Sequence, residues 1–324
     1  MSSFINRLRE QSALLKKRIA FPDATDARTL RASLILNDLG ICSPILIGIR
    51  REIEQIAVEH GLSIGQIPIV EPINSPEFEE YALKFAERRA EKGMTLEQAR
   101  EYIKNPLYYA GMMADSNVVD GCVAGSLSTT GDVLRAGIQT VGIEKGISVV
   151  SSFFLMVFAD KILCYTDCGV VPEPNEEQLA DIALSAARNF QKITNVEPRI
   201  AFLSFSTWGS AEHPAVLKVR RAALIFHDKA PTVISDGELQ ADAALIPEIA
   251  NRKAPNSAVG GNANILVFPD LNAGNISYKL TERLAGAQAL GPIIQGLNRP
   301  YCDLSRGCSV EDIVNIAAIC SLMV

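Results

Sequence analysis

Short apolar runs alternate with amphipathic helical segments in the first part of the chain. The predicted strands cover residues 19–21, 44–49 and 67–70, and the predicted helices cover residues 27–38 and 50–60. The two helices are expected to stop at Gly40 and Gly61, because glycine readily ends a helix. Strands that alternate with helices are typical of βαβ units, so the pattern predicts an α/β fold with a parallel sheet.

A long helical region follows these strands. Ser75 and Pro76 are typical of a helix start, and Thr95 with Gln98 has the spacing of a capping box that begins a second helix. Residues 119–127 then form an apolar run that predicts a buried strand.

The second half repeats this alternation. Its predicted strands cover residues 148–158, 161–165, 199–205, 232–235 and 264–268, and its predicted helices cover residues 176–191, 215–226, 237–250 and 274–284. A chain of 324 residues exceeds one average domain, so we expect two domains with a ligand site between them. No low-complexity linker separates the halves, and composition places their boundary near residues 142–146.

Composition favours small molecules over nucleic acid as partners. The chain has 48% hydrophobic residues and a net charge of -6, so no basic surplus favours nucleic acid. The longest apolar run, at residues 147–159, is interrupted by Ser151 and Ser152 and is too short to span a membrane. The N-terminal segment lacks the apolar core of a signal peptide. We therefore expect a soluble cytoplasmic protein with no membrane partner.

The rare residue types argue against several catalytic classes. Seven cysteines are an odd number for a disulfide framework, and Cys164 and Cys168 have no second Cys or His pair nearby to complete a zinc site. We expect no metal. Only three histidines occur, which makes a Ser-His-Asp hydrolase an unfavoured class. The usual dinucleotide, P-loop and nucleophile-elbow motifs are absent from the sequence.

One candidate segment lies at residues 125–132. Here a predicted strand leads into Ser128, Thr129, Thr130 and Gly131 at the start of a helix, with Arg135 one turn further on. Free backbone N–H groups, hydroxyls and a guanidinium at a helix start are able to bind a phosphate. The alternative is that Thr130 or Ser128 simply caps the helix.

Two further segments carry acidic groups. At residues 235–242, Asp236 would either line a cleft at the end of a strand or cap the next helix. Residues 303–312 place hydroxyls, a guanidinium, a thiol and carboxylates before an apolar helix, which suits acyl transfer. In this segment Ser309 and Asp312 also have the spacing of a capping box, so spacing alone leaves both roles of Asp312 open.

Several segments resemble those of the phosphate acetyltransferase family, whose members are also called phosphotransacetylases. The resemblance is carried by GSLSTTGDVLRAGIQ, SDGELQADAALIPEIA, APNSAVGGNANILVFPDLNAGNISYKL and GPIIQGLNRPYCDLSRGCSVEDI, and earlier by RIAFPDATDARTLRAS and AEKGMTLEQAREYIKNPLYYAGMM. It covers nearly the whole chain. By this resemblance the chain is identified as a member of the phosphate acetyl/butyryltransferase family.

The resemblance implies a fold and a reaction. We expect two α/β/α domains of the isocitrate dehydrogenase-like fold, residues 1–145 with 300–324 and residues 146–299, with the active site in the cleft between them. The implied reaction interconverts acetyl phosphate plus CoA with acetyl-CoA plus inorganic phosphate. CoA is then a substrate, no further cofactor is needed, and a homodimer is usual.

The resemblance also assigns residues. The catalytic aspartate falls on Asp312, beside Ser305 and Arg306, and the substrate-binding residues are Ser128, Thr129, Thr130, Gly131, Arg135, Arg89, Cys308. In this assignment the CoA thiolate attacks directly, with Asp312 as base or positioning group and the arginines facing the developing charge.

Several alternatives stay open beside this assignment. Cys308, at a helix start beside Arg306, has the electropositive setting that lowers a thiol pKa and would permit an acetyl-cysteine intermediate. The acyl group could be propionyl or butyryl, although the segment DGELQADAA favours acetyl. A catalytically silent regulatory domain and a metal-dependent hydroxyacid dehydrogenase are the other function classes to test.

Overall fold

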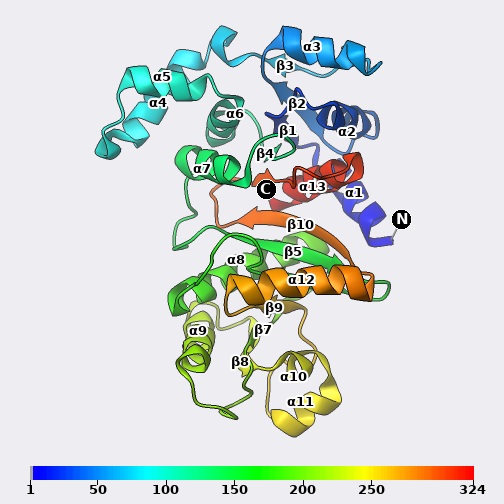
Figure 1. The fold of residues 1–324 in the computed structure, drawn as a ribbon, viewed down its shortest axis with the longest axis vertical. Coiled ribbons are helices and arrows are strands. Elements are labelled where there is room, and N and C mark those ends of the chain that lie inside the picture. The colour runs from blue at the N-terminus through cyan, green and yellow to red at the C-terminus, as the bar shows by residue number, and fades with distance from the viewer. Residues whose placement is uncertain (1–2) are drawn as a thin grey trace. The chain divides into compact units, whose positions relative to one another are not determined.

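The computed structural model of the protein describes residues 3–324, which form two compact units. Unit 1 contains Met1–Gly142 and Leu297–Val324, and unit 2 contains Ile143–Gly296. Unit 2 is therefore inserted between the two segments of unit 1. Each unit has its own sheet and its own helices (Figure 1).

Unit 1 is built on a parallel sheet of five strands in the order β11-β4-β1-β2-β3. The strands are β1 (Arg18–Phe21), β2 (Ser43–Ile47), β3 (Ile69–Val70), β4 (Gly121–Ala124) and β11 (Tyr301–Asp303). β4 is buried along its whole length and lies between β1 and β11. The predicted α/β fold with parallel strands is confirmed.

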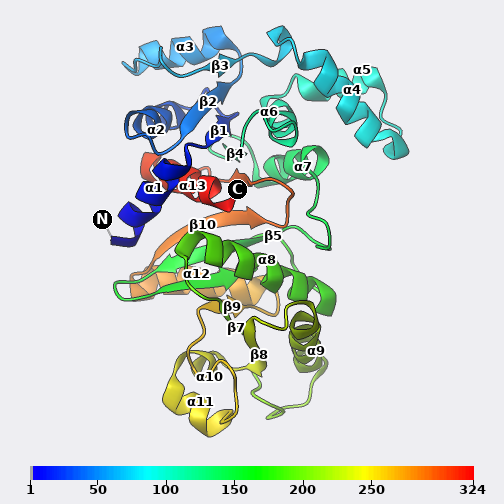
Figure 2. The same ribbon diagram turned by 180° about the vertical axis from the view of Figure 1, so that it is seen from behind.

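Helices pack on both faces of this sheet (Figures 1 and 2). One face carries α1 (Ser3–Leu15), α2 (Ala27–Asp38) and α13 (Val310–Met323), and the other carries α6 (Pro106–Asp115) and α7 (Thr130–Thr140). The remaining helices of unit 1 are α3 (Arg50–Glu59), α4 (Phe78–Arg88), α5 (Leu96–Ile103) and the 3-10 turns η1 (Pro72–Asn74) and η2 (Ala90–Lys92).

Helix α13 is covered on several sides, which agrees with its apolar sequence. It contacts β1 and β4 and is itself covered by α1 and α2. Ile313, Ile316 and Ile319 are all buried there, and burial of such a side chain contributes about 1.5–3 kcal/mol. This packing fixes the start of α13, where the segment 303–312 meets the helix.

Unit 2 has a mixed sheet in the order β10-β5-β6-β9-β7-β8. Its strands are β5 (Ser151–Val157), β6 (Ile162–Thr166), β7 (Arg199–Leu203), β8 (Ile234–Leu239), β9 (Ile265–Val267) and β10 (Gln288–Gln295). The β6, β9, β7 and β8 pairings are parallel, whereas β5 pairs antiparallel with β10 and β6. Its helices are α8 (Glu176–Thr194), α9 (Pro214–Lys229), α10 (Ala241–Leu245), α11 (Pro247–Lys253) and α12 (Leu271–Ala285).

Local signals predicted most helix starts correctly. The Thr95–Gln98 capping box is present at α5, with both reciprocal hydrogen bonds made. Ser75 is not a cap, because α4 begins only at Phe78 and its N-cap residue is Glu77. The strand predicted at residues 119–127 is shorter than expected, because the chain leaves the sheet after Ala124 and turns at Gly125.

The helix predicted at residues 237–250 is wrong in its start and in its continuity, although residues 241–245 and 247–250 are helical. Strand β8 continues to Leu239, since Gly237 pairs with Phe202 of β7. Two short helices, α10 and α11, then follow, with Ile246 between them and Pro247 as the first residue of α11. Asp236 lies within β8, so its alternative role as a helix cap is also wrong.

No helix within residues 3–324 combines the length and apolar character needed to cross a membrane.

Candidate active site

Three loops of unit 1 lie at the same edge of its sheet. Because β1, β4 and β11 are adjacent and parallel, the loops at residues 22–26, 125–129 and 304–309 all follow carboxyl ends of neighbouring strands. Helices α2, α7 and α13 begin where these loops end. The first and third candidate segments of the sequence are therefore brought together, whereas the segment at residues 235–242 belongs to unit 2.

Asp23 holds the loop between β4 and α7. One of its oxygens, Oδ2, accepts the N–H groups of Gly125 at 2.7 Å, Leu127 at 3.1 Å and Ser128 at 3.2 Å. The other, Oδ1, accepts the hydroxyl of Ser128 at 2.6 Å. Ser128 is thereby turned toward Asp23, and four hydrogen bonds to one carboxylate fix the loop.

The start of α7 is capped by Thr129, not by Thr130 or Ser128. The Thr129 hydroxyl accepts the N–H of Asp132 at 3.2 Å and donates to its carboxylate at 2.7 Å. Asp132 also pairs with Arg135 at 3.0 Å, on the surface. Within the described residues, the N–H groups of Thr130 and Gly131 have no protein acceptor. They are therefore available to an anion.

The capping box predicted for Asp312 is present at the start of α13. Its Oδ2 accepts the N–H and the hydroxyl of Ser309, each at 2.8 Å, and the Asp312 N–H donates back to that hydroxyl at 3.2 Å. No hydrogen bond within residues 3–324 engages Oδ1. A carboxylate has two oxygens that accept independently, so one oxygen serves the cap while the other remains available.

The two residues that share this loop with Asp312 are exposed. The Ser305 hydroxyl accepts the N–H of Gly307 at 3.2 Å. The Arg306 guanidinium has no hydrogen-bond or ion-pair partner in the described part of the chain. Arg306 is therefore free to meet an anionic ligand.

Arg28 joins the loops, and sequence reasoning did not find it. It pairs with Asp26 at 2.7 Å and donates to the carbonyl oxygens of Ser126 at 2.9 Å, Arg306 at 2.9 Å and Cys308 at 2.7 Å. One side chain thus connects the segment after β4 with the segment after β11. The only available signal was its position just after the acidic residues that follow β1.

Cys308 does not have the setting predicted for it. Its side chain is buried, and the cation near its sulfur is Arg28, 3.9 Å away, not Arg306. Burial raises the pKa of the Cys308 thiol, and the opposing effect of Arg28 is smaller. The thiol is therefore a weaker nucleophile than the helix-start position suggested.

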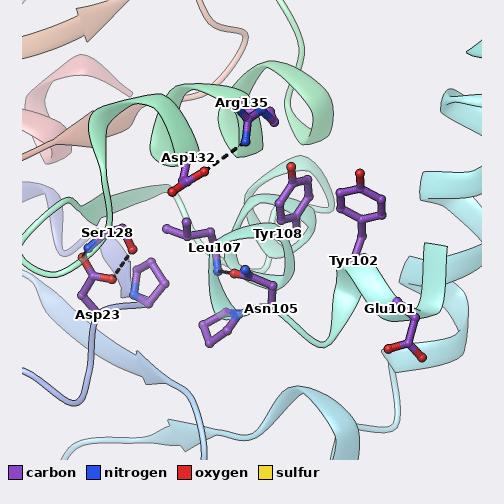
Figure 3. Close-up of a pocket in the computed structure, with 11 residues that line it drawn as sticks. Asp23, Glu101, Tyr102, Asn105, Leu107, Tyr108, Ser128, Asp132 and Arg135 are labelled. Carbon is purple, nitrogen blue, oxygen red and sulfur yellow. Dashed lines mark hydrogen bonds and ion pairs between the residues drawn. The ribbon is translucent and has the colours of Figure 1, made fainter. Parts of the chain in front are cut away.

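A pocket of about 600 Å³ lies beside the loop that Asp23 holds (Figure 3). It is lined by Pro22, Asp23, Glu101, Tyr102, Asn105, Pro106, Leu107, Tyr108, Ser128, Asp132 and Arg135. Figure 3 shows Asp23 and Ser128 on one side and the rings of Tyr102 and Tyr108 on the other. The two rings meet edge to face, and their centroids are 5.0 Å apart.

Arg89 lies near this pocket. Its positive charge and that of Arg135 both act on Tyr108, whose pKa is nevertheless raised, chiefly by burial. The Nε of Arg89 is buried and has no hydrogen-bond partner among the described residues. The adjacent Arg88 instead pairs with Asp115 at 2.7 Å. Of the two neighbouring arginines, Arg89 is thus the one available to a ligand.

The predicted residues therefore form two groups in unit 1. Arg135 and Arg89 lie at or near the pocket, and Arg306 and Asp312 lie at the start of α13. No ion pair or hydrogen bond within residues 3–324 joins the side chains of the two groups directly. The segments that carry them are connected by Arg28, which donates to a backbone carbonyl of each, and by the side-chain hydrogen bond from Thr130 to Asp303.

The acidic segment of unit 2 makes a separate cluster. Glu238 is 1% exposed and accepts two bonds from Arg220, at 2.8 and 2.9 Å, besides the N–H of Gly209 at 2.7 Å. Burial raises the pKa of Glu238, but these bonds outweigh it and leave the pKa at about 2. This pair stabilises the loop after β7. In residues 3–324 no group of His, Cys, Asp and Glu side chains is arranged to hold a metal ion.

Comparison with known proteins identifies the family. The family model described as phosphate acetyl/butaryl transferase matches residues 3–321. The chain belongs to this transferase family.

Relatives within the family match along the whole chain. The phosphate acetyltransferases of Acetivibrio thermocellus and Thermoanaerobacterium thermosaccharolyticum are 45% and 46% identical to it, and each alignment covers 98% of this chain and 97% or 98% of the relative. A crystal structure of a phosphotransacetylase from Streptococcus pyogenes is 39% identical, with a TM-score of 0.95 over 99% of this chain and 98% of that one.

Proposed function

We propose that the protein is a phosphate acetyltransferase, which interconverts acetyl phosphate plus CoA with acetyl-CoA plus inorganic phosphate. The observation that carries this proposal is the near-complete match to relatives of that name, at up to 46% identity. The geometry supports it, because the residues that the resemblance assigns to catalysis lie in the loop after β11 and in the first turn of α13, at one edge of the unit 1 sheet.

The start of α7 is the proposed phosphate site. Thr130 and Gly131 offer two unpaired N–H groups at the positive end of an eleven-residue helix. Arg135 adds a guanidinium on the same helix, and Arg306 adds an unpaired one from the neighbouring loop. These donors suit the phosphoryl oxygens of acetyl phosphate and the negative charge that develops on the acetyl oxygen.

Asp312 is the proposed base for CoA. Its free Oδ1 takes the proton from the CoA thiol, and the resulting thiolate sulfur attacks the acetyl carbonyl carbon. The bond from that carbon to the phosphate oxygen then breaks, and phosphate leaves with the electron pair. In reverse, phosphate attacks acetyl-CoA and Asp312 returns the proton to sulfur. Ser305 lies in the same loop as a further hydrogen-bonding group.

The pocket beside α7 is a proposed part of the CoA site. Its volume of about 600 Å³ lies within the usual range for ligand pockets. Arg135 lines it and Arg89 lies near it, so two cations are available for the CoA phosphates. Ser128 contributes to the wall of the pocket, where Asp23 holds its hydroxyl.

Direct transfer to CoA is favoured over an acetyl-cysteine intermediate. Cys308 is buried and its thiol pKa is raised, so little thiolate forms at neutral pH. CoA brings its own thiol, which makes a second nucleophile unnecessary.

Several finer assignments rest on the resemblance and stay proposals. These are the isocitrate dehydrogenase-like fold, the location of the active site between two α/β/α domains, and the domain limits 1–145 with 300–324 and 146–299. The homodimer and the preference for acetyl are further proposals of this kind, and the cytoplasmic location is a proposal that rests on the sequence composition.

The direct test uses the purified full chain with CoA and acetyl phosphate. We expect loss of free thiol to match formation of a thioester, and release of free thiol when acetyl-CoA and phosphate are supplied instead. Propionyl phosphate and butyryl phosphate measured in parallel define the acyl preference. A folded protein that consumes no CoA thiol with any of the three acyl phosphates would refute the proposal and favour a silent regulatory domain.

A further inference from the structure

The carboxylate of Asp303 lies directly against the loop that begins α7. Asp303 ends strand β11 and is 1% exposed. Its Oδ2 accepts the hydroxyl of Thr130 at 2.7 Å, while Oδ1 is buried and has no hydrogen-bond partner in the part of the chain that the structure describes. A Cβ atom on Gly125, in the same loop, would lie only 2.4 Å from this Oδ1. The unpartnered oxygen therefore faces the backbone that leads to the proposed phosphate site.

Within residues 3–324, the groups that shift the pKa of Asp303 include no cation. The titratable groups that face it are Asp23, from the loop after β1, and Tyr301, on β11 itself. From helix α7, Asp303 meets the neutral hydroxyl of Thr130. The residue after Asp303, Leu304, contributes its backbone N–H. Burial and the charge of Asp23 raise the pKa of Asp303 to about 6, against the opposing effect of the Thr130 hydrogen bond.

Two carboxylates thus hold the same loop from opposite sides. Asp23 follows β1 and holds the loop at Gly125, Leu127 and Ser128, whereas Asp303 ends β11 and holds it at Thr130. β4 lies between β1 and β11 in the sheet. A dianion at the start of α7 would bring further negative charge close to both carboxylates, and the one that is buried with an unsatisfied oxygen is the easier to neutralise.

We propose that Asp303 takes up a proton when a phosphate-type dianion binds at the start of α7, so that anion binding and protonation of this carboxylate are coupled. The inference rests on the proposed function for the location of the anion. The proton comes from solvent and binds Oδ1, while Oδ2 keeps its hydrogen bond from Thr130. Protonation of Asp303 therefore removes one negative charge beside the anion while the hydrogen bond to Thr130 is kept. Asp303 acts through Thr130 and is a positioning residue.

The size of the effect follows from linkage. Suppose that the bound anion raises the pKa of Asp303 by about one unit. The affinity of the protein for the anion is then about tenfold higher well below pH 6 than well above pH 7. At about pH 6.5 the same shift corresponds to uptake of about half a proton for each anion bound.

Sulfate is the appropriate probe, because it stays a dianion over this pH range whereas phosphate itself titrates. We expect calorimetry of sulfate binding to the full chain at about pH 6.5, in buffers of different ionisation enthalpy, to give this uptake of about half a proton. Asp303→Asn keeps an acceptor for Thr130 but removes the titration, so the uptake should vanish. Asp38→Asn changes the net charge equally at an exposed residue of α2, and should keep the uptake.

A second variant covers the case in which Asp303→Asn does not fold. Thr130→Ala removes the hydrogen bond that lowers the Asp303 pKa, so the carboxyl is already protonated near pH 6.5 and the uptake should move to higher pH.

Saturable sulfate binding without proton uptake, or an uptake that neither variant changes, would overturn the inference. Acetyl transfer is assayed on the same preparations. Activity without uptake contradicts the inference alone, and uptake without activity contradicts only the proposed function.

Discussion

Asp312 is expected to have two separable roles, one in stability and one in catalysis. Its Oδ2 closes the capping box with Ser309 through two bonds of 2.8 Å, and its Oδ1 is the proposed proton acceptor. Substitution by Asn keeps a carbonyl oxygen that can accept both Ser309 bonds but removes the base. Substitution by Ala removes both. The pair of variants therefore separates the two roles.

The expected magnitudes differ for the two variants. Loss of a helix-capping interaction costs about 0.5–2 kcal/mol, so Asp312→Ala should be destabilised by about that amount and Asp312→Asn by less. A positioned base contributes about 10²–10⁴-fold, so both variants should lose kcat by that order. We expect the KM for CoA to stay within a few-fold of wild type, because the base acts mainly in the transition state.

Helix α8 provides a matched control. Gln178 occupies the same position in a second capping box, where its side chain accepts the N–H of Asn175 at 3.0 Å. Gln178→Ala should lose stability in the same range as Asp312→Ala while keeping its turnover. Urea unfolding measures the first quantity and thioester formation the second. Near-normal turnover of a folded Asp312→Asn variant would show that Asp312 is only a capping residue.

Three further predictions concern other side chains, two of them in unit 1 and one in unit 2. Arg306→Gln and Arg135→Gln should both weaken turnover or acetyl phosphate binding, with the larger loss of kcat at Arg306; equal losses confined to thermal stability would show that neither arginine meets substrate. Cys308→Ala should keep at least about a tenth of kcat, with intersecting double-reciprocal lines; parallel lines, or an acetyl group on Cys308 after incubation with acetyl phosphate alone, would overturn direct transfer. Because the pKa of Glu238 lies at about 2, below its usual value of 4.5, its ion pair with Arg220 stabilises the fold above the higher value and is lost as pH falls through the lower one. The stability difference between wild type and Glu238→Gln should therefore shrink between these two pH values in urea titrations, and a constant difference would contradict the assignment.

The features that could be predicted from the sequence are those set by neighbours along the chain. The Thr95–Gln98 and Ser309–Asp312 capping boxes depend on residues three apart, and both are present. Helix α2 has the predicted bounds because its apolar period and its stop at Gly40 are local signals.

The features that sequence reasoning missed depend on contacts between distant residues. Only the last residues of β8, 237–239, fall in the predicted helix, because the strand is predicted at residues 232–235. Glu238 is buried in this part of β8, where its ion pair with Arg220 offsets the cost of burying its charge. Arg28 reaches Cys308 over a separation of 280 residues, so no spacing rule could reveal it. Asp303 lay inside a candidate segment, but its position under the α7 loop becomes visible only when β11 pairs with β4.

The insertion of unit 2 has a consequence for how unit 1 folds. Strand β11 and helix α13, which carry the segment with Asp312, follow unit 2 in the chain, so unit 1 cannot complete its sheet until unit 2 has been synthesised. The two ends of unit 2 are nevertheless joined, because the N–H of Glu144 donates to the carbonyl of Gly296 at 2.9 Å. Just outside them, the N–H of Asn298 donates to Gly142 at 3.0 Å.

Closing a long flexible loop costs conformational entropy that grows with the logarithm of its length. When unit 2 is folded, its two ends are held side by side, so they connect β4 and α7 to β11 as a short turn would. Most of the conformational entropy of loop closure has then already been lost. With unit 2 folded, the last strand of unit 1 can therefore close as if it were a near neighbour in sequence.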